Sequence, residues 1–345
     1  MMGTFTGLYE ENRDHMAKTK IALIGLGLIG KSMGKALSQA GAPAHLEIVG
    51  HDREPLAARE AQRVHAVART CWNVIEACRD ADIVIIATPP RGVRETLEAI
   101  AHDLKPRCLV MDTSSLKVPV LKWADELLPD GVSFVGGNPI LTERIQIEPS
   151  LTEDRSRADL FKGAIFCLTP SNKATQEATH LAADVVRLVG ATPFFVDPAE
   201  HDGLIAGVEH LPIMLGLALL RIMSNEPSWR EIRKVAGPPF ADVTRILTQD
   251  PSTSSDTLLL NRDNVVRLID VWVAELNNLR GLIETQDQNG LEQAIEAGVA
   301  AHQHWLKDRE AGLWEKPPPP ELPARGGFLG RMLGRWGDSK TDPDV

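Results

Sequence analysis

A glycine-rich turn near the start of the chain constrains its fold more than any other feature. Residues 21–30, IALIGLGLIG, place three glycines in a GxGxxG pattern directly after a short apolar run. The stretch that follows has apolar residues at helical spacing, and a second apolar run leads to Asp52. This context of strand, turn, helix and strand is what a dinucleotide-binding fingerprint requires. A glycine-rich turn in an unrelated α/β fold is the alternative.

Each position of this turn has a physical role in dinucleotide binding. Gly25 allows the tight turn, Gly27 lets the backbone approach the pyrophosphate, and Gly30 lets the helix pack close to the sheet. Leu28 and Ile29 lie between these glycines, where the helix begins. We count them among the cofactor-binding residues because a helix N-terminus faces the phosphate charge.

Residues after the next apolar runs extend the predicted cofactor site. Asp52 lies 22 residues after Gly30. A carboxylate there accepts hydrogen bonds from the ribose hydroxyls and repels a 2′-phosphate, which favours NAD over NADP. Arg53 could pair with such a phosphate, so NADP stays open. Thr88 and Pro89 are predicted to border the cofactor, with a plain strand-ending turn as the alternative.

Short apolar runs alternate with helix-like stretches as far as residue 197. The runs that we interpret as strands are 21–25, 46–50, 82–88, 108–112, 133–136, 164–168 and 194–196. Alternation of this kind predicts βαβ units and a mostly parallel sheet. The fold class is therefore α/β followed by all-α, with a Rossmann dinucleotide-binding domain over residues 19–197.

Residues 198–312 are predicted to form a helical substrate and dimerisation domain, because they contain only helix-periodic segments, at 204–223, 265–282 and 291–306. Residues 211–223 are apolar on nearly every side, which predicts burial all round, in part by a second subunit. We therefore expect a homodimer through this domain, with one central helix in a large monomer as the alternative. Residues 1–18 are expected to form a flexible arm and 313–345 a proline-rich flexible tail.

Composition excludes several other function classes. Acidic residues outnumber basic ones 47 to 37, for a formal charge of -10, which argues against nucleic-acid binding. None of the four cysteines forms a CxxC pair, and we expect no metal site. We find neither a signal peptide nor a transmembrane segment, so we expect a cytoplasmic protein that acts on a small-molecule substrate.

Several segments together resemble one family, the prephenate/arogenate dehydrogenases of tyrosine biosynthesis. They occur in the family's order over residues 20 to about 250 and read GLGLIGKSMG, DTSSLK, FVGGNP, LFKGAIFCLTP, EHDGLIAGVEHLP and FADVTRI. The resemblance implies an NAD(P)-dependent dehydrogenase. Such enzymes oxidise a cyclohexadienyl acid at its ring hydroxyl while a carboxylate leaves as carbon dioxide.

The resemblance also implies roles for individual residues. Ser115 matches the serine that hydrogen-bonds the substrate hydroxyl and the catalytic histidine; a helix N-cap is the alternative. Arg245 matches the arginine that binds the substrate carboxylate, although an isolated arginine is more often a solvated surface residue. His210 matches the histidine that opens the HLP segment, and a structural histidine is equally plausible. Pro212 should kink the helix there, since the carbonyl of Val208 loses its partner.

Two departures from the family pattern bear on activity. Asn138 stands where the family usually has its catalytic histidine, and an amide cannot take a proton at neutral pH. Ile213 stands where prephenate-using members often have a histidine, which favours arogenate or a related acid. The leading hypothesis is an NAD-dependent enzyme of this type at a reduced rate, in which His210 could substitute as base. The alternatives are a catalytically impaired NAD(H)-binding relative that acts as a sensor or regulatory module, and a dehydrogenase with a remodelled substrate pocket.

Overall fold

The computed structural model of the chain describes residues 18–40, 46–142, 154–248 and 250–311. These residues form two compact units, one of residues 18–142 and 154–196, the other of residues 197–311. The flexible tail predicted for 313–345 lies outside the described residues, as does all of the predicted arm except Lys18. The two units are described separately below.

The first unit is built on an eight-stranded sheet in the order β3-β2-β1-β4-β5-β6-β7-β8. Its strands are β1 (Thr19–Ile24), β2 (Leu46–His51), β3 (Arg69–Thr70), β4 (Ile83–Ile86), β5 (Leu109–Asp112), β6 (Ser133–Ile140), β7 (Ile165–Pro170) and β8 (Thr192–Phe195). Neighbouring strands are parallel except β6 and β7, which are antiparallel. The mostly parallel Rossmann-type sheet is thus confirmed, and its first six strands have the 3-2-1-4-5-6 order of dinucleotide-binding folds.

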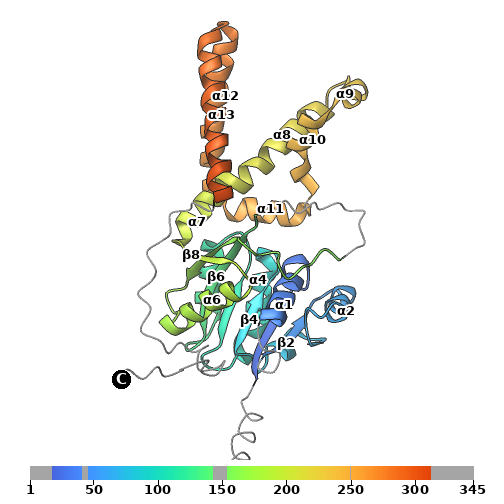
Figure 1. The fold of residues 1–345 in the computed structure, drawn as a ribbon, viewed down its shortest axis with the longest axis vertical. Helices are drawn as coiled ribbons and strands as arrows, with labels where there is room; N and C mark the ends of the chain where they lie inside the picture. Colours follow the sequence, from blue (N-terminus) through green and yellow to red (C-terminus); the bar gives the residue numbers. More distant parts are fainter. Residues whose placement is uncertain (1–17, 41–45, 143–153, 249, 312–345) are drawn as a thin grey trace, which may run out of the picture. The chain divides into compact units, whose positions relative to one another are not determined.

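Helices cover the sheet on both faces (Figure 1). They are α1 (Leu28–Ala40), α2 (Pro55–Arg63), α3 (Val74–Cys78), α4 (Pro90–Ile100), the 3-10 turn η1 (Ala101–Asp103), α5 (Val118–Leu127) and α6 (Gln176–Leu188). Helix α1 packs beside α6, while α4 packs beside α3 and α5. Strands β4 and β5 are buried at every residue, which explains why they are continuous apolar runs rather than alternating ones.

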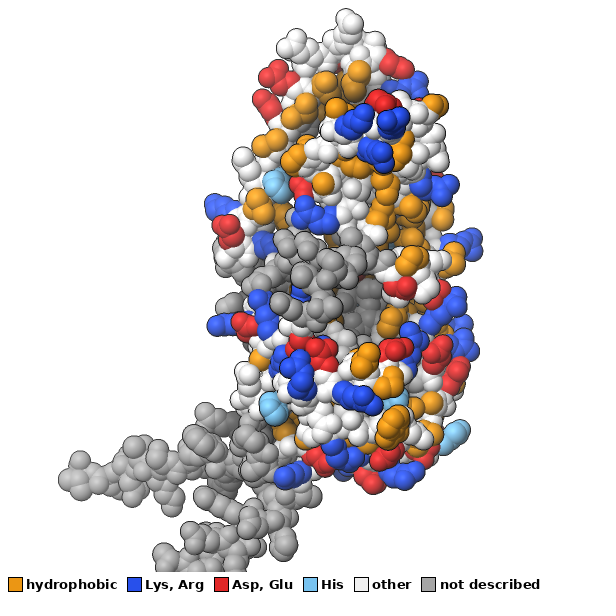
Figure 2. Space-filling view, turned by 90° about the vertical axis from the view of Figure 1, so that its right-hand side faces the viewer, with side chains coloured by type: hydrophobic (Ala, Val, Ile, Leu, Met, Phe, Trp, Pro, Cys, Tyr) orange, Lys and Arg blue, Asp and Glu red, His pale blue; other side chains and the backbone are white. Residues whose placement is uncertain are grey.

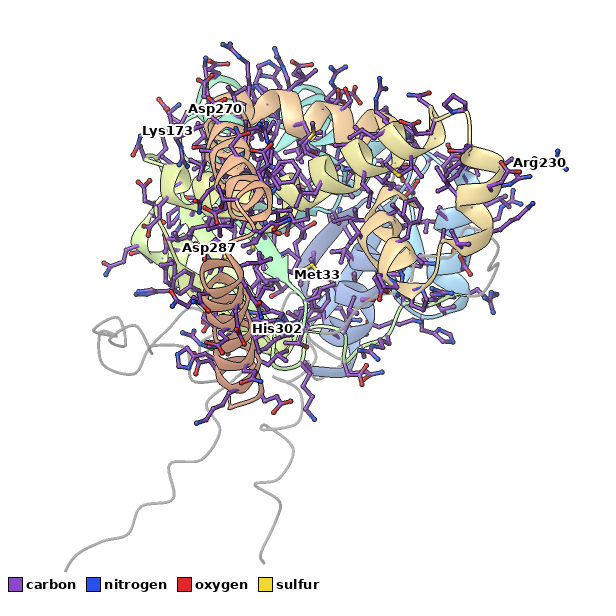
Figure 3. The ribbon with its side chains drawn as sticks, turned by 90° about the horizontal axis from the view of Figure 1, so that it is seen from above. Met33, Lys173, Arg230, Asp270, Asp287 and His302 are labelled. Atoms are coloured by element: carbon purple, nitrogen blue, oxygen red, sulfur yellow. The ribbon has the colours of Figure 1, made fainter. Side chains whose placement is uncertain are left out.

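Helix α1, which follows the glycine turn, is held on two sides. Its inner face carries Met33, labelled in Figure 3, which is fully buried. On another face, Lys31 and Lys35 each form a 2.9 Å ion pair with Asp154. Burial alone would raise the pKa of Asp154, but hydrogen bonds from both lysines and Ser156 lower it below its usual range. The helix that begins at the glycine turn is therefore anchored firmly to its own domain.

The second unit contains only helices among its described residues, which confirms the predicted helical domain. They are α7 (Pro198–Ile205), the π turn η2 (Ala206–His210), α8 (Leu211–Ser224), α9 (Trp229–Val235), α10 (Pro238–Thr244), the 3-10 turn η3 (Arg245–Thr248), α11 (Pro251–Leu260), α12 (Arg262–Glu284) and α13 (Gln288–Ala311). Helices α12 and α13 form an antiparallel pair, with Asp270 on the first and His302 on the second (Figure 3).

Where a kink was expected at Pro212, the structure has a π turn directly before it. The N–H of Leu211 bonds the carbonyl of Ala206, five residues back, so one extra residue is accommodated in the turn that ends at His210. Proline removes a helical hydrogen bond, and a π turn is one way to absorb the mismatch. Such turns occur frequently at functional sites.

The predicted all-round burial of residues 211–223 is wrong for a single chain. Only Gly216 of α8 is fully buried, whereas most of the other residues of this helix are half-buried and Leu217 and Ile222 are exposed. Within the described residues, the stretch Pro198–Ser224 is long and apolar enough to span a membrane by length and composition, and 22% of its apolar window is buried. Large apolar side chains are also exposed on α12 and α13, and hydrophobic residues gather over this domain in Figure 2.

Candidate active site

The glycine turn after β1 has the shape that its sequence predicts. Gly25 has φ +89°, and a Cβ there would lie 2.5 Å from the carbonyl oxygen of Ala87. A Cβ on Gly30 would collide with the carbonyl of Gly25, whereas a Cβ on Gly27 would meet nothing within 4 Å. Two glycines are thus required by the fold itself, and the third leaves open space beside the start of α1. A pyrophosphate fits that space, facing the first N–H groups of the helix.

Asp52 is held against the glycine turn by backbone N–H groups. Its carboxylate accepts from Leu26 at 2.6 Å and from Glu54 at 2.8 Å. These bonds place a half-buried carboxylate at the end of β2, where the ribose of a dinucleotide lies in this fold. Arg53, next to it, is exposed and free to turn toward a ligand.

Thr88 and Pro89 lie where β4 ends and α4 begins. Pro89 is the N-cap residue of α4 and is exposed. The Thr88 methyl group would lie 2.9 Å from a Cβ on Gly25, so this threonine borders the glycine turn. Its hydroxyl is buried and has no hydrogen-bond partner among the described residues. Because unpaired buried hydroxyls are uncommon, this group suits an acceptor on a bound nucleotide.

The contrast between Gly27 and Gly30 yields a matched pair of variants. Gly27→Ala should fold with a melting temperature close to that of the parent chain and lose at least about tenfold in NAD affinity, since its methyl fills the pyrophosphate space. Gly30→Ala should be destabilised by about 1–3 kcal/mol, since overpacking forces the backbone to shift. Thermal unfolding and calorimetric titration of NAD separate the two effects. If Gly27→Ala binds NAD normally, the pyrophosphate does not bind at this turn.

A fully buried ion pair organises the DTSSLK segment after β5. Lys117 and Asp112 both have side chains with 0% exposure, and the Lys117 Nζ lies 2.7 Å from each Asp112 carboxylate oxygen. Lys117 also donates to the carbonyl of Gly137 at 2.7 Å, and Asp112 accepts from the Gly137 N–H at 3.0 Å. The pair therefore ties this segment to β6, one residue before Asn138. Sequence reasoning did not single out either residue, since a lysine in a loop normally indicates a solvated surface.

Ser115 lies between these buried residues and is itself half-buried. The alternative that it caps a helix is wrong, because α5 begins at Val118 with Lys117 in the N-cap position. The neighbouring Ser114 instead binds Asp112, through its N–H at 2.9 Å and its hydroxyl at 2.5 Å. Ser115 is thus left on a loop at the carboxyl end of β5, the edge where ligands bind in open α/β sheets.

Asn138 lies inside β6 and is 4% exposed. It pairs with Cys167 of the antiparallel strand β7, so the sheet fixes its backbone on one side. On the other side, the bonds from Asp112 and Lys117 fix Gly137. The first unit therefore brings Ser115 and Asn138 to linked positions at one end of the sheet. An amide in this place can donate and accept hydrogen bonds but cannot act as a base.

Three further predicted site residues belong to the helical unit. His210 ends the π turn and is 1% exposed, and burial lowers its pKa. Ile213, in the first turn of α8, is half-buried. Arg245 at the start of η3 pairs with Asp242, and its side chain is 44% exposed. Among the described residues no group of three or more His, Cys, Asp or Glu side chains is placed to hold a metal ion.

Glu209, directly before His210, is a half-buried carboxyl group that the sequence analysis passed over. Burial raises its pKa from its ordinary value of 4.5 to about 7. Because the folded pKa lies above the unfolded one, the carboxylate reduces stability as pH rises from about 4.5 to 7 and has a constant effect above. Hydrophobic periodicity could not identify this group, because a single glutamate in an otherwise apolar helix is normally interpreted as a surface residue.

Glu209→Gln should therefore stabilise the chain at high pH only. At pH about 3.5 the free energies of unfolding of variant and parent should agree, because the carboxyl group is then protonated in both the folded and the unfolded chain. At pH about 8 the variant should gain up to about 3 kcal/mol, since each pKa unit corresponds to about 1.4 kcal/mol. Denaturant unfolding at both values measures this difference. An equal gain at both pH values would show that Glu209 keeps an ordinary pKa.

Two family models match this chain and cover most of it. The model for the prephenate dehydrogenase nucleotide-binding domain matches residues 33–194, and the model for the prephenate dehydrogenase dimerization domain matches residues 197–297. The boundary between the two matches falls where the structure divides into its two units.

Relatives and solved structures agree with these matches. The prephenate dehydrogenase of Bacillus subtilis is 29% identical over 276 residues, which cover 79% of this chain and 72% of that protein. The cyclohexadienyl dehydrogenase of Zymomonas mobilis is 28% identical, over 77% of this chain and 89% of its own. In fold, the chain is similar to a prephenate dehydrogenase from A. aeolicus, solved with hydroxyphenyl propionate and NAD+. That likeness has a TM-score of 0.74 at 24% identity and covers 84% of this chain and 99% of the other. With both of its domains represented in this chain, the prephenate dehydrogenase family is the one to which the chain belongs.

Proposed function

We propose that this chain is an NAD-dependent dehydrogenase that oxidatively decarboxylates a cyclohexadienyl acid, arogenate or prephenate, in tyrosine biosynthesis. The proposal rests mainly on one observation: the chain has both family domains, together with a glycine turn shaped for a dinucleotide. When bound, NAD accepts a hydride from the ring carbon that bears the hydroxyl group, while a carboxylate leaves as carbon dioxide.

The first unit supports NAD rather than NADP as the cofactor. The A. aeolicus relative was solved with NAD+. In this chain Asp52 keeps a carboxylate beside the turn, and a carboxylate repels a 2′-phosphate. The exposed Arg53 could weaken that preference by pairing with a 2′-phosphate. We expect a lower KM for NAD than for NADP.

The chain's own residues supply positioning for the acid. Ser115 would hydrogen-bond its ring hydroxyl, and Arg245 would bind its carboxylate through a forked, charge-assisted contact. Asn138 would hold the hydroxyl oxygen without removing its proton, so the reaction should be slow for this family. The apolar Ile213 favours arogenate over prephenate.

Reduction of NAD by the purified full chain tests this proposal. Arogenate and prephenate are each supplied with NAD or NADP, and NADH or NADPH formation is followed by absorbance. We expect measurable turnover with at least one acid and NAD, with arogenate preferred. If neither acid is oxidised although NAD binds tightly, the chain is not a dehydrogenase of this substrate class.

The buried Asn138 favours a second candidate function, a catalytically impaired relative that binds NAD(H) and a ligand as a sensor. In that case ligand binding should remain tight while turnover is absent. Calorimetric titration of NADH and of each acid separates this function from the first. The histidine variant described in the Discussion then distinguishes lost catalysis from a remodelled pocket.

We further propose that the chain is a cytoplasmic homodimer, assembled through its helical domain. Support comes from the dimerization-domain match over residues 197–297 and from the apolar side chains that α8 and α12 expose in one chain, such as Ile222 and Val271. A second copy of this chain would bury them. Sedimentation equilibrium should give twice the 37.7 kDa of one chain, and a single-chain mass at micromolar concentration would reject the dimer.

A further inference from the structure

A network of buried polar side chains lies inside the helical domain. His201 and Asp202 of α7 are 1% and 2% exposed, His210 is 1% exposed, and Asn261 is 6% exposed. Asn261 lies where α11 ends and α12 begins. Polar groups this deeply buried need hydrogen-bond partners, so the bonds around them define which atom carries each proton.

The amide of Asn261 has only one orientation that satisfies its neighbours. Its Nδ2 lies 2.8 Å from the backbone carbonyl of Asp202, and a carbonyl can only accept. Its Oδ1 accepts from Asn264 at 2.9 Å. Exchanging oxygen and nitrogen would set two acceptors against each other at Asp202. The nitrogen of Asn261 is therefore the atom that faces His210.

This orientation determines the tautomer of His210. The Asn261 Nδ2 lies 3.2 Å from the His210 Nδ1, and with its amide hydrogens it can only donate. The His210 Nδ1 must then carry a lone pair, and the proton of a neutral ring must be on Nε2. Burial lowers the pKa of His210, and His201 lowers it further while Asp202 raises it by less than burial lowers it; the net lowering keeps the ring neutral at physiological pH.

The Nε2–H of His210 is a donor without an acceptor. The atom is buried and has no hydrogen-bond partner among the described residues. An unsatisfied buried N–H typically costs about 1–3 kcal/mol. The same residue closes the π turn η2, a kind of distortion that is common at functional sites. These two observations point to a ligand atom as the missing acceptor.

We propose that Asn261 is a positioning residue that holds His210 as the Nε2–H tautomer, and that this N–H donates to a carbonyl or carboxylate oxygen of a bound ligand. The inference rests on the proposed function for the identity of that ligand, which is either the cyclohexadienyl acid or the nicotinamide carboxamide. In this arrangement the neutral His210 cannot accept a proton at Nε2, so it does not replace the base that Asn138 lacks.

Long-range ¹H–¹⁵N correlation spectra of the full chain, labelled at histidine nitrogens, test the tautomer directly. The His210 signals are assigned from their loss in His210→Gln. Native protein at about pH 7.5 should show a protonated Nε2 and an unprotonated Nδ1, and the Nε2–H signal should shift when ligand is added. A protonated Nδ1, a charged ring, or no shift with either NADH or the acids would overturn the proposal.

Asn261→Asp is the sharpest variant, since it keeps the shape but replaces the donor with an acceptor. The proton of His210 should move to Nδ1, and ligand affinity should fall by about tenfold to a hundredfold. Asn264→Ala is the matched control: it contacts Asn261 but not His210, and should keep the Nε2–H tautomer and the affinity.

Titrations of NADH alone, and of each acid with NADH saturating, identify the ligand. A loss confined to the acid assigns the acceptor to the substrate, whereas a loss for NADH assigns it to the carboxamide. Unchanged affinity for both in a folded Asn261→Asp would overturn the proposal. If that variant does not fold, the spectrum of the native chain and its change on adding ligand still test the proposal. If the chain shows the expected tautomer and binds the ligand but gives no turnover, the proposed enzyme function is rejected and the proposal about His210 stands.

Discussion

Asn138→His should raise kcat for the preferred cyclohexadienyl acid by about 10²–10⁴-fold, the usual contribution of a general base. The amide now at this position cannot take the proton of the substrate hydroxyl, whereas a neutral imidazole can. Strand β6 already fixes the backbone of residue 138 through Cys167 on one side and Gly137 on the other. The backbone should therefore hold the Cα of the new histidine in a fixed position.

Initial rates of NADH formation across pH check this expectation. The variant should gain an ascending limb with an apparent pKa near 6–7, which reports the imidazole, while the parent chain should lack it. Asn138→Gln is the control, because it changes size but adds no base, and its rate should not rise. If the histidine variant folds, binds NAD and is no faster, Asn138 belongs to a pocket remodelled for another substrate.

Lys117→Met should lower the free energy of unfolding by about 3–5 kcal/mol, since it leaves Asp112 as an uncompensated buried charge. The lost ammonium group binds both oxygens of Asp112 and the carbonyl of Gly137. Methionine has a similar length, so packing is largely kept. Few single substitutions in this chain should have a larger effect, because both partners have 0% exposure.

Denaturant unfolding of single and double variants isolates the pair. Asp112→Asn in the Lys117→Met background should recover part of the loss, since a neutral amide can still accept from Gly137 and Ser114. Lys122→Met, on the exposed side of the adjacent helix α5, is the control. Its side chain is 72% exposed and 4.0 Å from Glu126, so its effect should stay within about 0.5 kcal/mol. If both lysine variants lose a similar free energy of unfolding, the buried pair is not the source of the effect at Lys117.

The pair should also link the stability of this region to the proposed catalytic roles of Ser115 and Asn138. Asp112 and Lys117 hold the backbone on which Ser115 and Asn138 are carried. Loosening these bonds should therefore change kcat even in variants that remain folded. The sequence analysis found Ser115 and Asn138 through family resemblance but did not find their support, because the DTSSLK segment contains no periodic pattern that indicates burial.

Several elements were predictable because their signals are local. Each predicted apolar run became a strand. The signal is strongest in β4 and β5, since residues buried on both faces of a parallel sheet must be apolar throughout. Strand β3 was missed because two residues are too short for a pattern. From the missing N–H of Pro212 we predicted a kink, whereas the structure has a π turn, η2, which contacts α7 and α12.

The sequence by itself determined the Rossmann sheet, the helical second half and the turn for a dinucleotide. These depend on hydrophobic period, glycine spacing and one carboxylate, which are properties of neighbouring residues. Only the tertiary structure decided that Lys117 is buried, that α8 exposes apolar side chains, and that Asn261 lies beside the ring of His210. Those features join residues distant in the chain, and a buried charge or a tautomer is determined by the atoms that surround it in space, which no short window of sequence contains.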